Sequence, residues 1–266
     1  MMQGDRMKNY DNDKKNNDKG RDGLQLIVGR NPVTEALKSG KLIDTVFVDP
    51  DAKGSIANIV RLAKQNGIVV KQARGEKLDR MSAGASHQGV AAMVACAEYS
   101  TVEKMLEDAA AKGEDPFLII CDEIEDPHNL GAIIRTAETA GAHGVIIPER
   151  RSASLNATVY KTSAGAVSWM PVARVKNLAA CIDDLKKQGV WIYGTDGSGE
   201  DYRSVSMKGA MALVVGSEGF GMGRLIKDKC DFLLSLPMKG RINSLNASVA
   251  AGIFMYEAVR QRQEQG

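Results

Sequence analysis

Five short runs of consecutive apolar residues recur between residues 117 and 235, separated by longer stretches of mixed polarity. An apolar run of this length without alternation is typical of a strand buried on both faces, as in a parallel sheet covered by helices. The runs predict strands at 117–121, 144–147, 190–194, 211–215 and 231–235. The pattern between and after them predicts helices at about 130–140, 176–188 and 246–262. This order favours an α/β fold built on a mainly parallel sheet.

A smaller α/β pattern precedes this region, from Leu24 to about Glu98. It predicts four strands, at 26–28, 45–48, 68–70 and 90–94, and two helices, at about 31–37 and 56–66. Gly67 follows the second helix directly, as is typical where a helix ends. A segment of this length is sufficient for a small domain with a core of its own.

The two remaining segments have little to bury. Residues 1–23 are rich in asparagine, aspartate, lysine and glycine, which predicts a disordered tail. Residues 99–116 are polar and alanine-rich, which predicts a helical linker. We therefore expect a tail at 1–23, a small domain at 24–98, a linker at 99–116 and a large domain at 117–266.

Composition excludes several classes of protein. The net charge of +2 does not by itself indicate a nucleic-acid binder, although it allows a local basic face formed by Arg150, Arg151, Lys161, Arg174 and Lys176. The four cysteines stand singly and the three histidines do not cluster with them, which argues against structural zinc, any other metal and disulfides. No apolar run approaches the ~20 residues that span a bilayer, and no secretion signal is visible, so we expect a cytoplasmic protein.

Two common nucleotide-binding motifs are absent from the sequence. No Gly-x-Gly-x-x-Gly opens a helix after the first strand, because the glycines at 219–223 have the wrong spacing. No Gly-Lys-Ser or Gly-Lys-Thr phosphate loop occurs either. The sequence therefore supports neither a dinucleotide-dependent dehydrogenase nor a P-loop nucleotidase.

Three segments place glycines and short polar side chains beside apolar runs. They read DPHNLGAIIR at 126–135, VVGSEGFG at 214–221 and LPMKGRINSLNA at 236–247. Ligands of open α/β sheets bind at the carboxyl ends of the strands, where strand ends and helix amino termini present free backbone groups. The three segments are therefore the candidate ligand-binding loops.

Each notable residue of these segments also has a purely structural interpretation. Asn129 is well placed as the N-cap of the helix that follows it. Arg135 points away from the buried side of that helix and could form an ion pair with Glu138. Glu218 could be a turn residue between two glycines.

The last predicted helix, at about 246–262, can also be interpreted in a structural or a functional way. Its apolar face is formed by Leu245, Val249, Ile253 and Tyr256. Small residues at 247–252 allow another backbone to approach closely, either in the domain's own sheet or in a second subunit. A core helix alone would explain the apolar face, but not the polar residues at its start.

Taken together and in this order, the three segments resemble the signature motifs of the SpoU (TrmH) family of SPOUT-class RNA 2′-O-ribose methyltransferases. The resemblance implies that residues 117–262 form a mainly parallel α/β domain with a C-terminal trefoil knot. It implies an enzyme that transfers a methyl group from S-adenosylmethionine to a ribose 2′-hydroxyl, without a metal. It also implies a homodimer in which each active site uses residues of both subunits.

The resemblance also assigns roles by position in the motifs. It implies catalytic roles for Asn129, Arg135, Glu218, Ser244 and Asn246. It implies S-adenosylmethionine binding by the loops at Thr195, Gly216, Leu236 and Leu245. The family assigns activation of the 2′-hydroxyl to the arginine at position 135. Because arginine stays protonated at neutral pH, we expect it to hold a flanking phosphate and stabilise the developing alkoxide instead.

Residues 24–98 resemble the small RNA substrate-binding domain, similar to a ribosomal protein, of the family branch that acts on large-subunit ribosomal RNA. The segments at 29–32 and 87–89 carry this match. The leading hypothesis is therefore 2′-O-methylation of ribosomal RNA at a large-subunit (23S) guanosine. Alternatives are methylation of a tRNA ribose, methylation of a ribosomal adenosine that confers antibiotic resistance, and a non-catalytic RNA-binding factor in ribosome assembly.

Overall fold

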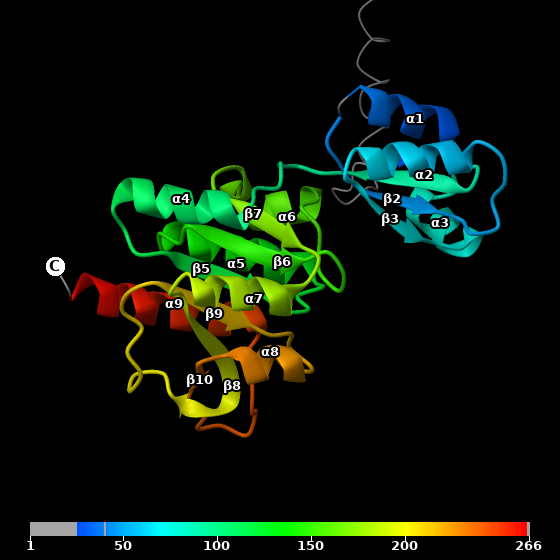
Figure 1. Cartoon of the computed structure of the whole chain (residues 1–266). Coiled ribbons are helices and arrows are strands. Elements are labelled where there is room, and N and C mark those ends of the chain that lie inside the picture. The colour runs from blue at the N-terminus through cyan, green and yellow to red at the C-terminus, as the bar shows by residue number, and fades with distance from the viewer. Residues whose placement is uncertain (1–25, 40, 265–266) are drawn as a thin grey trace, which may run out of the picture.

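The computed structural model describes residues 26–39 and 41–264, which form two lobes joined by a short segment (Figure 1). The tail predicted at residues 1–23 lies outside the described residues. Each lobe contains one sheet, of four strands in the amino-terminal lobe and six in the carboxyl-terminal lobe.

The amino-terminal lobe has a mixed sheet covered by helices on both faces. Its elements are β1 (Leu26–Val28), α1 (Arg30–Lys38), β2 (Ile43–Val48), α2 (Ile56–Gln65), β3 (Val69–Gln72), α3 (Gly75–Ser82) and β4 (Val90–Val94). The strand order is β1-β4-β2-β3, in which only the β2–β3 pair is parallel. The α3 helix was not predicted, because Leu78 and Met81 are its only large apolar residues.

The carboxyl-terminal lobe confirms the predicted parallel sheet. Its strands are β5 (Phe117–Cys121), β6 (Gly144–Pro148), β7 (Val172–Val175), β8 (Trp191–Asp201), β9 (Met211–Val215) and β10 (Phe232–Ser235). They are arranged in the order β10-β8-β9-β5-β6-β7, and every neighbouring pair is parallel. The helices are α4 (Val102–Lys112), α5 (Pro127–Thr139), α6 (Ala157–Thr162), α7 (Leu178–Lys187), α8 (Arg224–Lys229) and α9 (Ala247–Gln263), with the 3-10 helix η1 (Ala166–Ser168).

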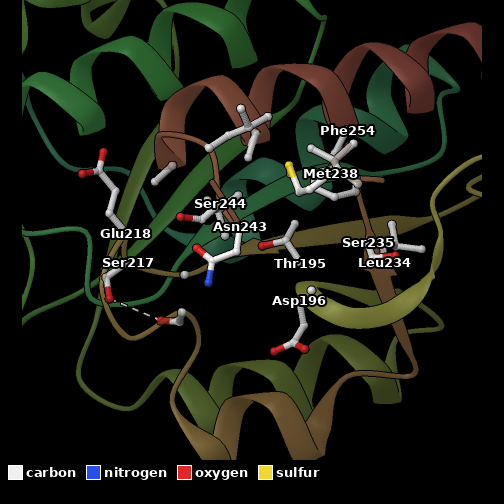
Figure 2. Close-up of a pocket in the computed structure, with 18 of the residues that line it drawn as sticks. Thr195, Asp196, Ser217, Glu218, Leu234, Ser235, Met238, Asn243, Ser244 and Phe254 are labelled. Carbon is white, nitrogen blue, oxygen red and sulfur yellow. Dashed lines mark hydrogen bonds between the residues drawn. The ribbon is translucent and has the colours of Figure 1, made fainter. Parts of the chain in front are cut away.

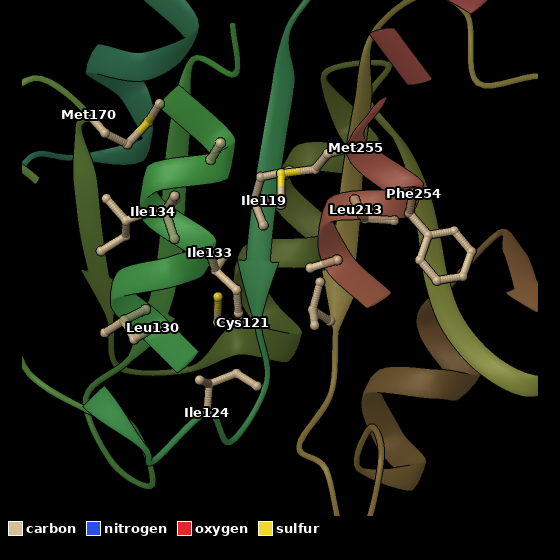
Figure 3. Packing of buried hydrophobic residues seen from close by; sticks show 14 of the residues in the cluster. Ile119, Cys121, Ile124, Leu130, Ile133, Ile134, Met170, Leu213, Phe254 and Met255 are labelled. Carbon is tan, nitrogen blue, oxygen red and sulfur yellow. The ribbon is translucent and has the colours of Figure 1, made fainter. Parts of the chain in front are cut away.

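The two faces of the large sheet have separate cores. Successive residues of a strand point to opposite faces. Phe117, Ile119 and Cys121 of β5 therefore pack against α5 and α9 (Figure 3). Leu118 and Ile120 pack against α4, α7 and α8. Because all five residues of β5 are buried, the strand is apolar throughout. This burial explains why the sequence pattern predicts it.

The sequence pattern missed four elements of this lobe, β7, α6, η1 and α8, and misjudged one face of α9. The β7 strand contains an arginine, and α6 and α8 have only six residues each, too few to show a helical period. The described part of α9 buries Ala247, Ala251, Phe254, Met255 and Ala258. The predicted apolar face lies outward instead, with Val249 52%, Ile253 37% and Tyr256 51% exposed. The interpretation of that face as a core contact within one subunit is therefore wrong.

A buried polar cluster joins the two lobes. Asp44 of β2 is fully buried and accepts hydrogen bonds from Arg174 Nη1 at 2.8 Å, Tyr99 Oη at 2.6 Å and Thr45 Oγ1 at 2.6 Å. The Arg174 guanidinium also lies over the Tyr99 ring, 4.2 Å from its centre. Burial and the negative charge of Asp44 raise the pKa of Tyr99. The sequence allows Arg174 to be part of a local basic face, but the side chain instead neutralises a buried carboxylate between the lobes.

Removing one charge of this cluster should destabilise the protein strongly. In the Arg174→Met variant the Asp44 carboxylate would be left buried without its cation, which typically costs about 3–5 kcal/mol. We expect this loss in urea unfolding followed by circular dichroism. Adding Asp44→Asn to this variant should recover part of the loss, because the uncompensated charge is then gone. Equal stability of the wild type and Arg174→Met would contradict this account.

Candidate active site

A cavity of about 500 Å³ opens at the carboxyl edge of the parallel sheet (Figure 2). Its wall is formed by β8, by the loop after β9, by the loop after β10 and by the start of α9. Four of the lining residues are those that the resemblance assigns to cofactor binding: Thr195, Gly216, Leu236 and Leu245. Ligands of open α/β sheets bind at this edge.

The loop after β9 is folded tightly on itself. Ser217 N donates to Gly221 O at 3.0 Å, and Gly221 N donates to Ser217 O at 2.9 Å. A Cβ atom on Gly216 would overlap the main chain of Gly221 and Met222, so only glycine fits there. The Asp122 carboxylate at the end of β5 accepts a hydrogen bond from Gly223 N at 2.7 Å. Burial raises the pKa of Asp122, and the Gly223 N–H partly counters that rise.

Three predicted catalytic residues meet at the edge of this cavity. The Oδ1 atom of Asn246 caps α9 by accepting from Ser248 N at 3.0 Å and Val249 N at 3.2 Å. Its Nδ2 atom therefore faces away from the helix and donates to Asn129 Oδ1 at 2.9 Å and to Glu218 Oε1. Asn129 Nδ2 donates in turn to Glu218 Oε1 at 2.8 Å. We call this group the Asn129–Glu218–Asn246 cluster.

The interpretation of Asn129 as an N-cap is wrong. The cap of α5 is Asp126, whose Oδ1 accepts from His128 N at 2.9 Å. Pro127 occupies the first helical position, where its missing N–H costs nothing. The Asp-Pro pair at 126–127 is the sequence signal for this cap. Because Asp126 caps the helix, the Asn129 side chain is available to the cluster.

The other two predicted catalytic residues lie apart from the cluster. Ser244 lines the same cavity (Figure 2). Arg135 is exposed on α5, and neither Glu138 nor any other described acid lies within ion-pair distance of it. Six residues after Asn129, it is about 9 Å further along the helix and on another side of it. Arg135 does not line the described cavities.

Several lining residues were not predicted from the sequence. They are Asp196, Ser217, Met238, Asn243 and Phe254, all within the cavity wall. Ser217 and Asn243 adjoin assigned motif positions, so their place in the two loops was the available signal. Phe254 comes from the middle of α9, and no local pattern indicates that it reaches this wall.

The described residues offer no other obvious chemistry. No group of three or more His, Cys, Asp or Glu among them could hold a metal ion. Burial raises the pKa of Cys121 to about 12 and that of Cys181 to about 11, so these thiols stay protonated. None of the helices within 26–39 and 41–264 is long and apolar enough to cross a membrane.

Comparison with known protein families identifies both lobes. Residues 116–256 match the SpoU rRNA Methylase family, and residues 26–100 match the family of RNA 2′-O ribose methyltransferase substrate-binding domains. The chain therefore belongs to the SpoU (TrmH) family of SPOUT-class methyltransferases, as the three motifs indicated.

Relatives and solved structures cover both lobes. A protein of Bacillus subtilis, named as a TrmH family tRNA/rRNA methyltransferase, is 49% identical over 242 residues, covering 90% of this chain and 97% of the relative. The SpoU methyltransferase AviRb of Streptomyces viridochromogenes, in complex with AdoMet, has a TM-score of 0.58 and 25% identity over 92% of each chain. An AdoMet-bound rRNA methyltransferase of Sinorhizobium meliloti has a TM-score of 0.57 and 26% identity, covering 88% of this chain and 86% of that one. The chain is an RNA methyltransferase of this family.

Because Gly216 lies close to the main chain of Gly221 and Met222, its replacement can be tested without a ligand. Gly216→Ala should force the loop after β9 apart and destabilise the protein by about 1–3 kcal/mol, as overpacking typically does. Gly219→Ala in the same loop is the matched control, because a Cβ atom there meets nothing within 4 Å. Thermal unfolding of both variants measures the difference, and equal melting temperatures would contradict the prediction.

Proposed function

We propose that this enzyme transfers the methyl group of S-adenosylmethionine to the ribose 2′-hydroxyl of a guanosine in large-subunit (23S) ribosomal RNA. The observation that carries the proposal is the Asn129–Glu218–Asn246 cluster at the edge of a cavity of about 500 Å³. The cluster joins one residue from each of the three motifs, which lie far apart in the sequence. Such a cluster can orient a ribose beside a ligand in the cavity.

The cavity lining fits S-adenosylmethionine. Leu236, Leu245 and Phe254 provide apolar surface for an adenine ring. Thr195 and the main chain around Gly216 provide polar groups for the ribose and amino acid parts. When bound, this co-substrate supplies an activated methyl group on a sulfonium. The described residues would position the ribose and provide the charges that stabilise the reacting groups.

Glu218 is fixed in a way that suits a hydroxyl substrate. Both amide contacts go to its Oε1 atom, and Oε2 has no hydrogen bond to a described residue. Oε2 can therefore accept a hydrogen bond from a ribose hydroxyl. The two asparagine amides stay neutral and keep the carboxylate in place. Accurate positioning of this kind can supply up to ~7–11 kcal/mol of barrier reduction.

Arg135 is proposed to act in the site of a partner subunit. The exposed residues Val249, Ile253 and Tyr256 form an apolar stripe along α9. The α5 helix packs beside α9, since a Cβ on Gly252 would lie 3.6 Å from Thr136 Cγ2. Arg135 therefore lies next to the stripe. A homodimer that buries the stripe would carry Arg135 toward the partner, where its guanidinium can hold an RNA phosphate and stabilise the developing alkoxide.

The amino-terminal lobe is proposed to select the RNA. The two segments that carry its resemblance lie side by side, because Arg30 Nε donates to Gln88 O at 2.9 Å. Asn31, Pro32 and Gln88 are exposed at this place, so an RNA loop could bind there. A trefoil knot, which the family resemblance implies, and a cytoplasmic location, which the sequence predicts, both stay predictions.

The direct test of the reaction incubates the full chain and labelled S-adenosylmethionine with unmodified ribosomal RNA and, in a separate reaction, with unmodified transfer RNA. We expect label at one alkali-resistant linkage in the large-subunit RNA, because a 2′-O-methyl group removes the internal nucleophile. Label in transfer RNA, or on a ribosomal adenosine, would favour those alternatives. Cofactor binding without transfer to any RNA would favour the assembly factor.

The role of Arg135 predicts the behaviour of Arg135→Lys. An ammonium group keeps the charge but lacks the planar fork that matches a phosphate, so kcat should fall at least about tenfold. S-adenosylmethionine affinity, measured by calorimetry, should not change. Arg203→Lys on the distant β8–β9 connection is the control. A near-normal kcat for Arg135→Lys would show that the fork does not matter.

The proposed dimer predicts that a charge in the α9 stripe disrupts it. Ile253→Glu should give a monomer in sedimentation velocity and lose activity, because a buried unpaired carboxylate opposes association. Leu225→Glu, at another exposed apolar residue on α8, should remain dimeric. A wild-type chain that sediments as a monomer at micromolar concentration would overturn this part of the proposal.

A further inference from the structure

A second cavity, of about 340 Å³, adjoins the first one. Ser217 and Glu218 belong to the walls of both cavities, and Asn129 lines the second cavity. The rest of the second wall comes from residues 123–126 after β5 and from the tip of the loop after β9. The Asn129–Glu218–Asn246 cluster therefore stands between two cavities. A ribose held at the cluster would have the cofactor cavity on one side and the second cavity on the other.

An aromatic side chain stands in the wall of the second cavity. Phe220 is 93% exposed, at the tip of the loop between Gly219 and Gly221. The paired hydrogen bonds between Ser217 and Gly221 hold this tip in place. Exposed aromatic side chains on a fixed support are a common surface for stacking unpaired RNA bases. No packing role within the described residues explains a phenylalanine there.

The charged side chains that line this cavity are all carboxylates, which accept hydrogen bonds and, when ionised, cannot donate them. Glu123, Glu125 and Asp126 present carboxylates, and the lining contains no lysine or arginine. Glu123 Oε1 is held by Arg151 Nη1 at 2.7 Å, which orients that side chain. Such a wall repels a phosphate and favours a group that donates N–H bonds. The cavity is therefore suited to a base edge and not to the RNA backbone.

We propose that the second cavity binds the base of the nucleotide to be methylated, with the base stacked on Phe220 and its N–H donors directed at the carboxylates. Guanine presents N1–H and the N2 amino group side by side, which suits an acceptor wall best. Uracil presents one N–H between two carbonyl oxygens, which the wall would repel. This inference rests on the proposed function, because it takes the ribose at the cluster as the substrate.

A binding test separates this proposal from catalysis. Guanosine and uridine are added in turn to the full chain with S-adenosylhomocysteine, and saturation-transfer difference NMR detects which nucleoside binds. We expect a guanosine signal that clearly exceeds the uridine signal and that is largely lost in Phe220→Ala. Phe220→Tyr should keep the guanosine signal. Glu125→Gln should weaken it, because a carboxylate acceptor of the cavity wall is lost, whereas Glu107→Gln on α4, the matched surface control, should leave it unchanged. Equal signals for the two nucleosides, or no effect of Phe220→Ala, would overturn the subsite.

A kinetic test uses the RNA site mapped by the alkali-resistance experiment. Phe220→Ala should lower kcat/KM by about tenfold or more through lost stacking, while cofactor affinity stays unchanged. An RNA with inosine in place of the target guanosine lacks the N2 amino group, so the wild type should methylate it with a lower kcat/KM. This decrease should be smaller in the Glu125→Gln variant. A mapped target that is a uridine would overturn the subsite and leave methyl transfer standing. Selective guanosine binding without methylation of any RNA would support the subsite and refute the proposed function.

Discussion

The orientation of one amide, that of Asn246, determines the arrangement of the site. Its oxygen is committed to the first N–H groups of α9, so its nitrogen must face the other way. The nitrogen then sets the direction of the Asn129 amide, and both amides donate to the same oxygen of Glu218. The polar groups of the site are thereby tied to a helix terminus. A helix terminus is a rigid support, which accurate positioning requires.

The backbone around this cluster is held by equally local constraints. Gly216 allows the loop after β9 to fold against its own main chain. Asp122, at the end of the neighbouring strand β5, binds Gly223 at the far end of the same loop. The loop is therefore attached to the sheet at both of its ends. Glu218, Phe220 and the wall of the first cavity all depend on this attachment, because they belong to the loop or adjoin it.

Much of the fold could be predicted because burial leaves a direct trace in the sequence. The strand β5 is buried on both faces and reads as a continuous apolar run. Elements that leave a weaker trace, such as the six-residue helix α6, could not be predicted. The outward face of α9 was misjudged for a physical reason: an apolar stripe has the same pattern whether it meets its own sheet or another subunit.

The site was predicted less completely than the fold. The motifs identified Asn129 and Glu218, which are 89 residues apart in sequence yet form a hydrogen bond. They did not reveal that Asp126 caps α5 or that Arg135 lies away from the cluster. The second cavity has no sequence signature, because it forms only where the loop after β5 meets the loop after β9. Contacts between distant segments of this kind can be read only from the folded chain.

The distribution of charge over the protein fits separate surfaces for the RNA base and the RNA backbone. A net charge of +2 is small for a protein that binds RNA. Two arginines are also committed to ion pairs, Arg174 with the buried Asp44 and Arg151 with Glu123, so neither is free for a phosphate. The acidic wall beside Phe220 removes further positive potential at the point where a base would enter. In the arrangement proposed above, a bound RNA would present its backbone to other surfaces, such as Arg135 of the proposed partner subunit and the amino-terminal lobe, while its base and ribose would enter the two cavities.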